Sequence, residues 1–201
     1  MNTVRALLDK AGRTYAEEAG IRLADKPAPL YQLLVLSILL STRIKADIAV
    51  AAGQELRKLA PTPRKMLDAT WQDRVDALGR AHYVRYDEST ATALGDGAQL
   101  LLDEFGGDLR TARGDDLATQ LRRFPRLGPV GVDIFCREAQ AVWPELRPYL
   151  DKKTLDGAKK VGLPQDPDAL AELAGDDVSR LAAALVRVSL DRKLADAVRA
   201  A

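Results

Sequence analysis

The chain has 201 residues, enough for one or two small domains with a sizeable core. Its 30 basic and 29 acidic residues give a formal net charge of +1, so overall charge does not indicate a polyanion partner. The single cysteine, Cys136, and the single histidine, His82, exclude an intrachain disulfide, a Cys/His zinc site and a four-cysteine iron–sulfur cluster. No apolar run is long enough for a signal peptide at the start or for a membrane span elsewhere, so we expect a soluble cytoplasmic protein.

Helical periodicity runs through the first half of the chain without strand alternation, which predicts an all-α fold. Residues 30–41 are apolar almost all round, which is typical of a buried central helix. Thr62, followed by Pro63, and Thr70, followed by Asp73, are typical N-terminal caps. The pattern predicts helices over residues 3–19, 30–41, 46–59, 64–69 and 71–78.

The second half begins with a long predicted helix over residues 87–105, which Gly106 and Gly107 end. A Pro/Gly turn over residues 124–131 and an apolar segment over residues 132–143 follow. Asp151 stands just before a further helical pattern. The remaining predicted helices cover residues 115–124, 153–161, 168–174 and 177–190.

The turn reads Phe124-Pro125-Arg126-Leu127-Gly128-Pro129-Val130-Gly131. A turn of this kind leaves backbone N–H groups unpaired at the start of the second helix, and such groups suit a phosphate. Gly128 and Gly131 let the backbone approach a ligand without side-chain obstruction. On spacing alone, however, most such turns simply connect two helices, and the neighbouring arginines could be a solvated face.

Three segments, in order, resemble the endonuclease III superfamily of DNA glycosylases. Residues 29–42, which end in Leu-Leu-Ser-Thr, are similar to the first barrel helix of that family, which ends in Leu-Leu-Ser. Residues 124–132 are similar to its hairpin, which reads roughly Leu-Pro-Gly-Val-Gly-Arg-(Lys, Ser or Trp)-Thr-Ala. Leu150-Asp151, followed by residues 160–163, resembles the family's Val-Asp loop and the helix after it.

This resemblance implies a two-lobed, all-α DNA glycosylase fold. Residues 26–135 would form a six-helix barrel with a helix-hairpin-helix. Residues 1–25 and 136–201 would form a second lobe, with Asp151 facing the cleft between the two. The implied partner is double-stranded DNA with a damaged base or an abasic site, bound by a monomer without a membrane. No cofactor is expected apart from a monovalent cation at the hairpin carbonyls, and no iron–sulfur cluster.

The resemblance also implies a catalytic role for Asp151. Breaking a base–sugar bond builds positive charge on the deoxyribose, and a nearby carboxylate stabilises that charge and orients or deprotonates the attacking water. From the residues alone, Asp151 is an N-cap of the helix that follows it. The two roles are compatible.

In the family, a lysine at the hairpin position of Val130 forms a Schiff base and goes on to cut the strand. Valine has no nucleophile, so we expect a monofunctional DNA N-glycosylase that uses water. Three alternatives stay open: a bifunctional glycosylase and lyase using Lys152 or Lys153, a non-catalytic helix-hairpin-helix DNA-binding protein, and a helical adaptor. Arg126, where the family has glycine, favours the DNA-binding protein.

The family fills the gap left by the extruded base with two loops, which correspond here to residues 42–44 and 80–83. For His82 a packing role is equally consistent with the sequence. Tyr83, Tyr86 and Trp71 could stack on a base, although aromatic residues near helix ends are more often core. The expected DNA contacts are Thr42, Arg43, Ile44, Arg80, His82, Arg126, Leu127, Gly128, Val130, Gly131, Lys152 and Lys153.

Overall fold

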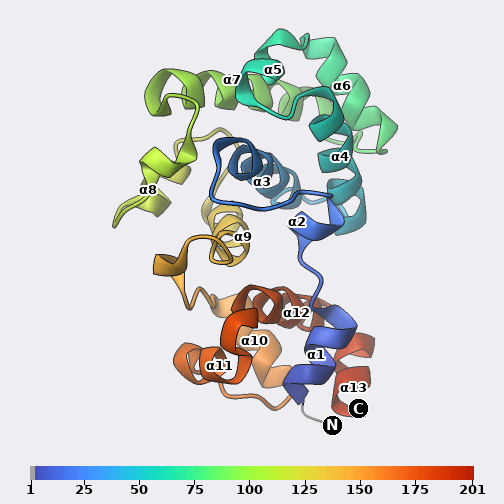
Figure 1. Ribbon diagram of the computed structural model, residues 1–201. Coiled ribbons are helices and arrows are strands. Elements are labelled where there is room, and N and C mark those ends of the chain that lie inside the picture. Colours follow the sequence, from blue (N-terminus) through green and yellow to red (C-terminus); the bar gives the residue numbers. More distant parts are fainter. Residues whose placement is uncertain (1–2) are drawn as a thin grey trace. The chain divides into compact units, whose positions relative to one another are not determined.

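The computed structural model describes residues 3–201, and all regular secondary structure within these residues is helical (Figure 1). The predicted all-α class is therefore confirmed. The chain divides into two compact units. We call Glu18–Phe135 the middle unit, and the described residues up to Glu17 together with Cys136–Ala201 the terminal unit.

The first boundary between the units lies earlier than the predicted boundary after residue 25. The segment after Glu17 belongs to the middle unit because it packs there. Ala19 and Ile21 are buried, and the Gln54 amide donates to the carbonyl of Glu18 at 2.7 Å.

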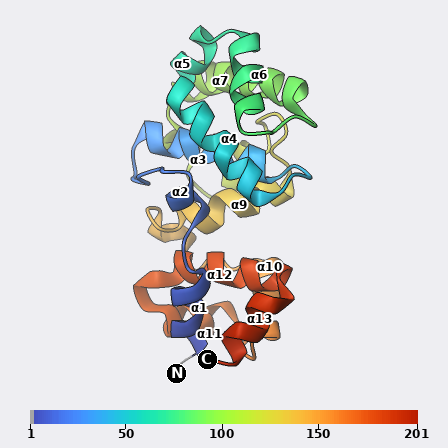
Figure 2. The ribbon, with the colours of Figure 1, turned by 90° about the vertical axis from the view of Figure 1, so that its right-hand side faces the viewer.

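The middle unit is built around α3, in which every residue from Leu30 to Leu39 except Gln32 is buried, as the apolar pattern predicts. Helix α3 packs on α4, α4 packs on α6, and α7 packs on both α5 and α6, as Figure 2 shows. The helices of this unit are α3 (Pro27–Leu40), α4 (Ala46–Leu59), α5 (Pro63–Asp68), α6 (Trp71–Arg80), α7 (Asp87–Phe105), η1 (Leu109–Ala112) and α8 (Leu117–Leu121).

The predicted helix ends of the middle unit are confirmed where a local cap sets them. The Thr62 side chain accepts from the amide of Lys65, with Pro63 at the first helical position. Thr70 and Asp73 form a complete capping box. Gly106 ends α7 in the left-handed conformation with φ +61°, which glycine adopts without the penalty that a Cβ imposes.

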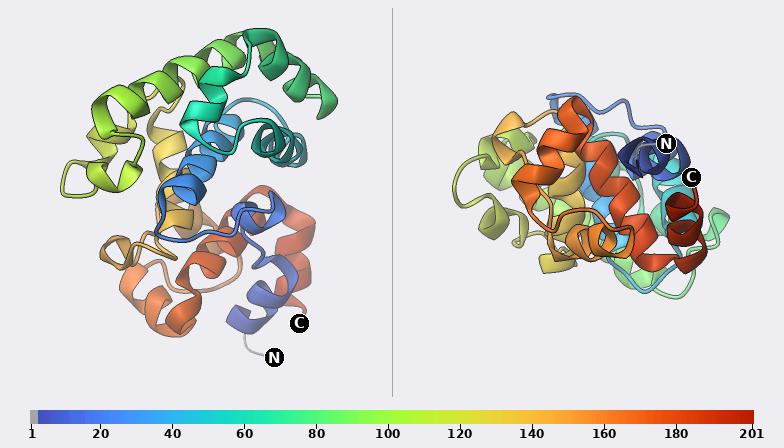
Figure 3. Two further views of the ribbon diagram at one scale, coloured as in Figure 1. Left: turned by 45° about the horizontal axis from the view of Figure 1, so that its top comes forward. Right: turned by 90° about the horizontal axis from the view of Figure 1, so that it is seen from below.

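The terminal unit is organised around α12, which packs against α1, α10, α11 and α13. In the right view of Figure 3, α1 in dark blue and α13 in dark red lie side by side. A Cβ on Gly157 of α10 would lie 1.9 Å from the carbonyl oxygen of Leu185, so α10 contacts the α12 backbone directly. The helices are α1 (Thr3–Ala11), α10 (Lys152–Lys160), α11 (Pro167–Ala174), η3 (Gly175–Asp177), α12 (Val178–Leu190) and α13 (Arg192–Arg199).

The first predicted helix is wrong as a single element. It consists of α1 and a short α2 (Tyr15–Glu18) with a break at residues 12–14. The break is stabilised from outside the segment, because the carboxylate of Glu138 accepts from the amides of Tyr15 and Ala16 at 2.8 and 3.2 Å. These are the first amides of α2, which have no helical acceptor.

Helix α9 (Pro129–Ala139) begins in the middle unit and ends in the terminal unit, and a short 3-10 turn, η2 (Pro144–Leu146), follows it. The helix therefore begins and ends earlier than the apolar segment predicted over residues 132–143. Of the helices in residues 3–201, none is both long and apolar enough to cross a membrane.

Candidate functional site

The predicted hairpin is present in the middle unit as α8, a turn and the start of α9. Two apolar side chains anchor the turn, since Phe124 and Leu127 are only 1% and 2% exposed. Phe124 stacks on Phe105 with ring centroids 5.6 Å apart. Leu127, which we expected to contact DNA, therefore offers a ligand only its backbone.

The first turn of α9 presents its backbone outward. The first helical hydrogen bond runs from the amide of Val132 to the carbonyl of Gly128 at 3.0 Å, so the amides of Val130 and Gly131 precede the helical ladder. Gly128 is exposed, and a Cβ there would meet nothing within 4 Å. Val130 is also exposed, at 64%. These features make an open helix N-terminus that suits an anion.

Gly131 has a different task from Gly128. A Cβ on Gly131 would lie 2.6 Å from Cδ1 of Leu127 and 3.5 Å from Cβ of Ser41. Its lack of a side chain therefore lets α9 close against the turn and against the end of α3. Gly131 shapes the hairpin, and Gly128 leaves its outer surface bare.

Arg126, in the turn, adopts the left-handed backbone conformation, with φ +64°. This conformation costs a residue other than glycine about 1–2 kcal/mol. The side chain is exposed, but two contacts hold it: Nη1 donates to Oγ of Ser89 at 2.6 Å, and the guanidinium lies over the Tyr86 ring, 5.5 Å from its centroid. The carbonyl of Arg126 accepts from Oγ of Ser41 at 3.3 Å.

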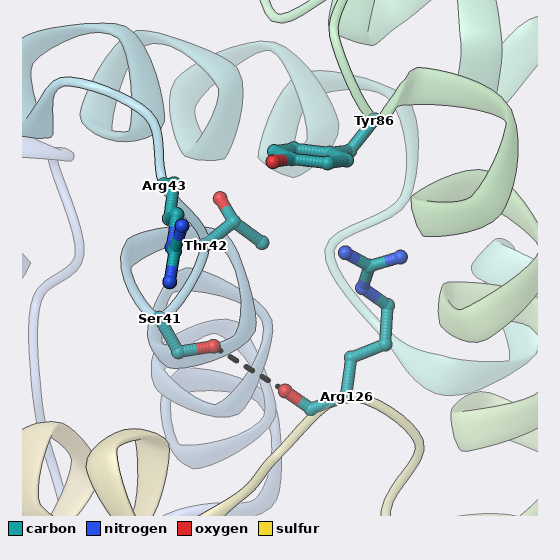
Figure 4. Close-up of a pocket in the computed structure, with 5 residues that line it drawn as sticks. All are labelled: Ser41, Thr42, Arg43, Tyr86 and Arg126. Atoms are coloured by element: carbon teal, nitrogen blue, oxygen red, sulfur yellow. Dashed lines mark hydrogen bonds between the residues drawn. The ribbon is translucent and has the colours of Figure 1, made fainter.

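These contacts create a pocket of about 410 Å³ in the middle unit, shown in Figure 4. Its walls come from the end of α3, the connector after it, the residue before α7 and the hairpin turn. We call it the Tyr86 pocket, and it is lined by Ser41, Thr42, Arg43, Tyr86 and Arg126. It brings together three of the predicted DNA contacts, and two of its walls, Ser41 and Arg126, are 85 residues apart in sequence.

The three remaining predicted contacts from the two loops, residues 42–44 and 80–83, do not line this pocket. Ile44 is half-buried. Arg80 is exposed but its Nε is paired with Oε2 of Glu55 at 2.9 Å. His82 is exposed in the left-handed conformation with φ +62°, and Tyr83 beside it is fully buried.

In the terminal unit, Asp151 is the N-cap of α10, as its position before the helical pattern predicts. Its Oδ1 accepts from the amide of Thr154 at 3.3 Å. The carboxylate is also paired with Arg137 of α9, whose Nη1 lies 3.0 Å from Oδ2 and 3.3 Å from Oδ1. Both side chains are largely buried, with 11% of Arg137 and 13% of Asp151 exposed.

The loop between α9 and Asp151 is held by Gln140, whose side chain is fully buried. Its Nε2 donates to the carbonyl of Tyr149 at 3.0 Å, and its Oε1 accepts from the amide of the same residue at 2.9 Å. Arg147 donates to the carbonyls of Gln140 and Ala141, just after the end of α9. The two hydrogen bonds of Gln140 therefore fix the backbone of Tyr149, two residues before Asp151. The peptide between Arg147 and Pro148 is cis.

Sequence reasoning did not identify Arg137, Gln140 or Arg147 as part of this arrangement. The available signal was a polar pair, Arg137 and Glu138, in an otherwise apolar helix. Burial raises the pKa of the Glu138 carboxyl, while the amides of Tyr15 and Ala16 and the Thr14 hydroxyl act to lower it.

Lys152 and Lys153 are exposed at the start of α10, and Lys152 is paired with Asp156 at 3.1 Å. In the part of the chain that the structure describes, no three His, Cys, Asp or Glu side chains gather where they could hold a metal ion.

Neither a protein-family model nor a curated protein sequence matches the chain. Its structure is similar to a trapped covalent intermediate of endonuclease III with DNA, described as an estranged-adenine complex. The similarity covers 92% of this chain and 85% of that one, with a TM-score of 0.52 and 12% sequence identity. The chain therefore has the helical fold of endonuclease III, as the resemblance of its sequence to that superfamily implies.

Proposed function

We propose that the protein is a monofunctional DNA N-glycosylase, which hydrolyses the bond between a damaged or mispaired base and its deoxyribose in duplex DNA. The observation that carries the proposal is Asp151. In a chain with the fold of endonuclease III, a carboxylate is fixed at the N-terminus of α10 by a backbone amide and a guanidinium.

The contacts of Asp151 support a water-directing role. A carboxylate offers about four lone-pair sites. Oδ1 accepts from Thr154 and from Arg137, whereas Oδ2 accepts from Arg137 only. One site on Oδ2 therefore stays available for the attacking water, whose proton the carboxylate would accept as the sugar becomes positively charged.

The hairpin supports the expectation that no Schiff base forms. Val130 stands on the exposed first turn of α9 and has no amine. Lys152 is exposed and paired with Asp156. A glycosylase of this kind leaves an abasic site in an intact strand.

Binding of double-stranded DNA would rest on the open N-terminus of α9. Its bare backbone at Gly128 and the unpaired amides of its first turn suit a phosphate group, independent of sequence.

One observation favours a second function, a non-catalytic DNA-binding protein. Asp151 is already neutralised by Arg137, and a neutralised pair stabilises a sugar cation less than a lone carboxylate does. In that case the pair would serve only to fix α10 to α9.

The deciding experiment is an excision screen with duplexes that each carry one lesion: an alkylated purine, uracil, an oxidised pyrimidine or an oxidised guanine. A glycosylase converts one of them into an abasic strand that breaks after alkali, and Asp151→Asn does not. Duplex binding without excision of any of these bases would support the binding protein instead.

A further inference from the structure

The middle unit has a second pocket, of about 310 Å³, which lies on α5, α6 and α7. Helix α7 packs on the other two helices, as Figure 2 shows. The pocket shares no lining residue with the Tyr86 pocket and includes none of the hairpin residues 124–131. We call it the Arg74 groove, and its walls include Leu67, Trp71, Arg74, Thr92, Gly95 and Asp96.

Arg74 lies half-buried on α6, with its guanidinium against the backbone of α7. Its Nη1 donates to the carbonyl of Ala91 at 2.5 Å, whereas Nε is buried without a partner among the described residues. Within residues 3–201, no carboxylate forms an ion pair with Arg74. The carboxylate of the neighbouring Asp73 accepts instead from the amide of Thr70 at 2.9 Å. Since a charge withdrawn from water is normally paired, an anion at this guanidinium would stabilise it.

Gly95 of α7 makes room for the guanidinium. A Cβ on Gly95 would lie 2.2 Å from Nη1, 3.0 Å from Cζ and 3.1 Å from Nη2 of Arg74. Glycine inside a helix is less stable than alanine, so α7 gives up stability where it admits the arginine. Nη2 is neither buried nor hydrogen-bonded to another described residue, and its two donors are therefore available to a ligand.

Trp71 supplies an apolar surface beside Arg74, three residues away on the same face of α6. Its Nε1 donates to Oγ1 of Thr92 at 3.1 Å, which fixes the ring, and 40% of the residue is exposed. Leu67, near the end of α5, is half-buried and extends the apolar surface. A cation next to a fixed apolar surface suits an anion with an apolar body.

Asp96 narrows the choice of anion. It is exposed and directly follows Gly95 in α7. The described lining of the groove therefore has one positive and one negative side chain, Arg74 and Asp96, and no net charge. The carboxylate of Asp96 repels a nucleic-acid backbone, which carries a charge at every phosphate. A ligand with a carboxylate and an ammonium a few bonds apart complements both walls.

We propose that the Arg74 groove binds a small zwitterion with an apolar body, which is the chemistry of an apolar α-amino acid. The carboxylate of the ligand accepts from Nη2 of Arg74, its ammonium donates to Asp96, and its side chain lies on Trp71 and Leu67. The volume of about 310 Å³ is within the usual range of small-ligand pockets. This binding does not depend on the proposed function, because it involves neither DNA nor Asp151.

The test compares three molecules of nearly the same shape: L-phenylalanine, L-phenylalaninamide without the carboxylate, and hydrocinnamate without the amine. Calorimetry and tryptophan fluorescence with the full-length protein should give L-phenylalanine a Kd on the order of 1 mM, which is usual for a ligand of this size. The amide should bind at least about tenfold more weakly, because it loses a charged acceptor for Arg74. Hydrocinnamate should bind about threefold more weakly, since Asp96 is exposed.

Gly95→Ala tests the groove without weakening α7. Its Cβ would displace the flexible end of Arg74, while alanine favours the helix. This variant should melt close to the wild-type temperature and bind L-phenylalanine at least about tenfold more weakly. Gly97→Ala is the matched control, since a Cβ there would make only ordinary contacts, with Phe124 and Pro125, both at 3.8 Å. It should bind as the wild type does.

Asp96→Asn changes an exposed side chain and should leave the melting temperature unchanged. It should remove the difference between L-phenylalanine and hydrocinnamate. No binding of L-phenylalanine up to about 10 mM would overturn the proposal. Equal binding of L-phenylalanine and either analogue by the wild type would do the same, as would undiminished binding by a folded Gly95→Ala protein.

A competition experiment separates the Arg74 groove from the DNA-binding surface. Duplex DNA should not displace L-phenylalanine, and displacement would overturn the proposal because the groove would then belong to the surface that binds DNA. Gly95→Ala should leave duplex affinity and excision unchanged. Failure of the amino-acid site and failure of the glycosylase therefore appear in different assays.

Discussion

Asp151→Asn is the substitution that separates catalysis from structure. As an N-cap, asparagine is about as good as aspartate, so the cap alone predicts a cost of only a few tenths of a kcal/mol. Loss of the ion pair with Arg137 predicts a larger decrease in stability than loss of the cap. The amide keeps one acceptor oxygen for Arg137 or Thr154 but carries no charge.

The magnitude follows from the burial of the pair. Removing one partner of a fully buried ion pair costs roughly 3–5 kcal/mol. The two side chains here are 11% and 13% exposed, which lets water relieve part of the loss, and the asparagine oxygen still accepts a hydrogen bond. We therefore expect about 2 kcal/mol, within the range for hydrogen bonds to charged groups. For a chain of this size, the melting temperature should fall by about 4–8 °C.

The assay combines thermal melting with single-turnover excision on the lesion that the screen identifies. Excision by Asp151→Asn should fall at least about 100-fold, since the amide neither accepts a proton nor offsets a cation. The double variant Arg137→Met with Asp151→Asn should recover more than half of the lost stability, because it no longer buries the charge of Arg137 without a carboxylate partner. It should not recover excision.

Two results would refute this reasoning separately. Normal excision by a folded Asp151→Asn protein would remove Asp151 from the chemistry and leave the DNA-binding function in its place. An unchanged melting temperature would show that Arg137 contributes nothing to stability through the pair.

Four further outcomes are expected. Duplex affinity should fall with rising salt, and Gly128→Glu should weaken binding while Gly128→Lys does not, because a side chain there meets nothing in the fold; equal binding by both variants would exclude the hairpin. Borohydride should trap no protein–DNA adduct, and a trapped adduct would point to Lys152 or Lys153. Tyr31→Phe should raise stability by about 1 kcal/mol, since Oη is buried without a partner among the described residues; a lower melting temperature would contradict this. Burial raises the pKa of Glu138 above 4.5, so the native state keeps a proton that the unfolded chain loses, and stability falls as pH rises from 4.5 through the folded pKa. The wild-type melting temperature minus that of Glu138→Gln should therefore be larger near pH 4.5 than near pH 7.5, and a constant difference would refute the shift.

Features set by neighbouring residues could be predicted from the sequence. The caps at Thr62, Thr70 and Asp151 depend on a side chain and an amide three residues later. The buried course of α3 depends on apolar residues all round the helix. Each of these follows from the composition of one short segment, so no knowledge of the fold is required.

Features set by distant segments could not be predicted in the same way. The break between α1 and α2 has a local part, since Thr14 and Glu17 form a capping box at the start of α2. Its other part is distant, because Glu138 lies 123 and 122 residues from the two amides that it accepts from. A helical pattern over residues 3–19 does not reveal that a buried carboxylate will cap its middle. The pairing of Arg137 with Asp151 likewise requires the loop that Gln140 folds back.

At Arg126 in the hairpin, both neighbouring residues and distant segments determine the structure. The turn residues around it predict a tight connection, and the family pattern predicts glycine at this position. The arginine departs from that pattern without changing the backbone, which keeps φ +64°. Its contacts with Ser89 and Tyr86 are worth about 1–2 kcal/mol together, similar to the strain they offset. Stability alone therefore does not favour arginine over glycine here. What arginine adds is a fixed positive charge in the wall of the Tyr86 pocket, next to the helix N-terminus that suits a phosphate.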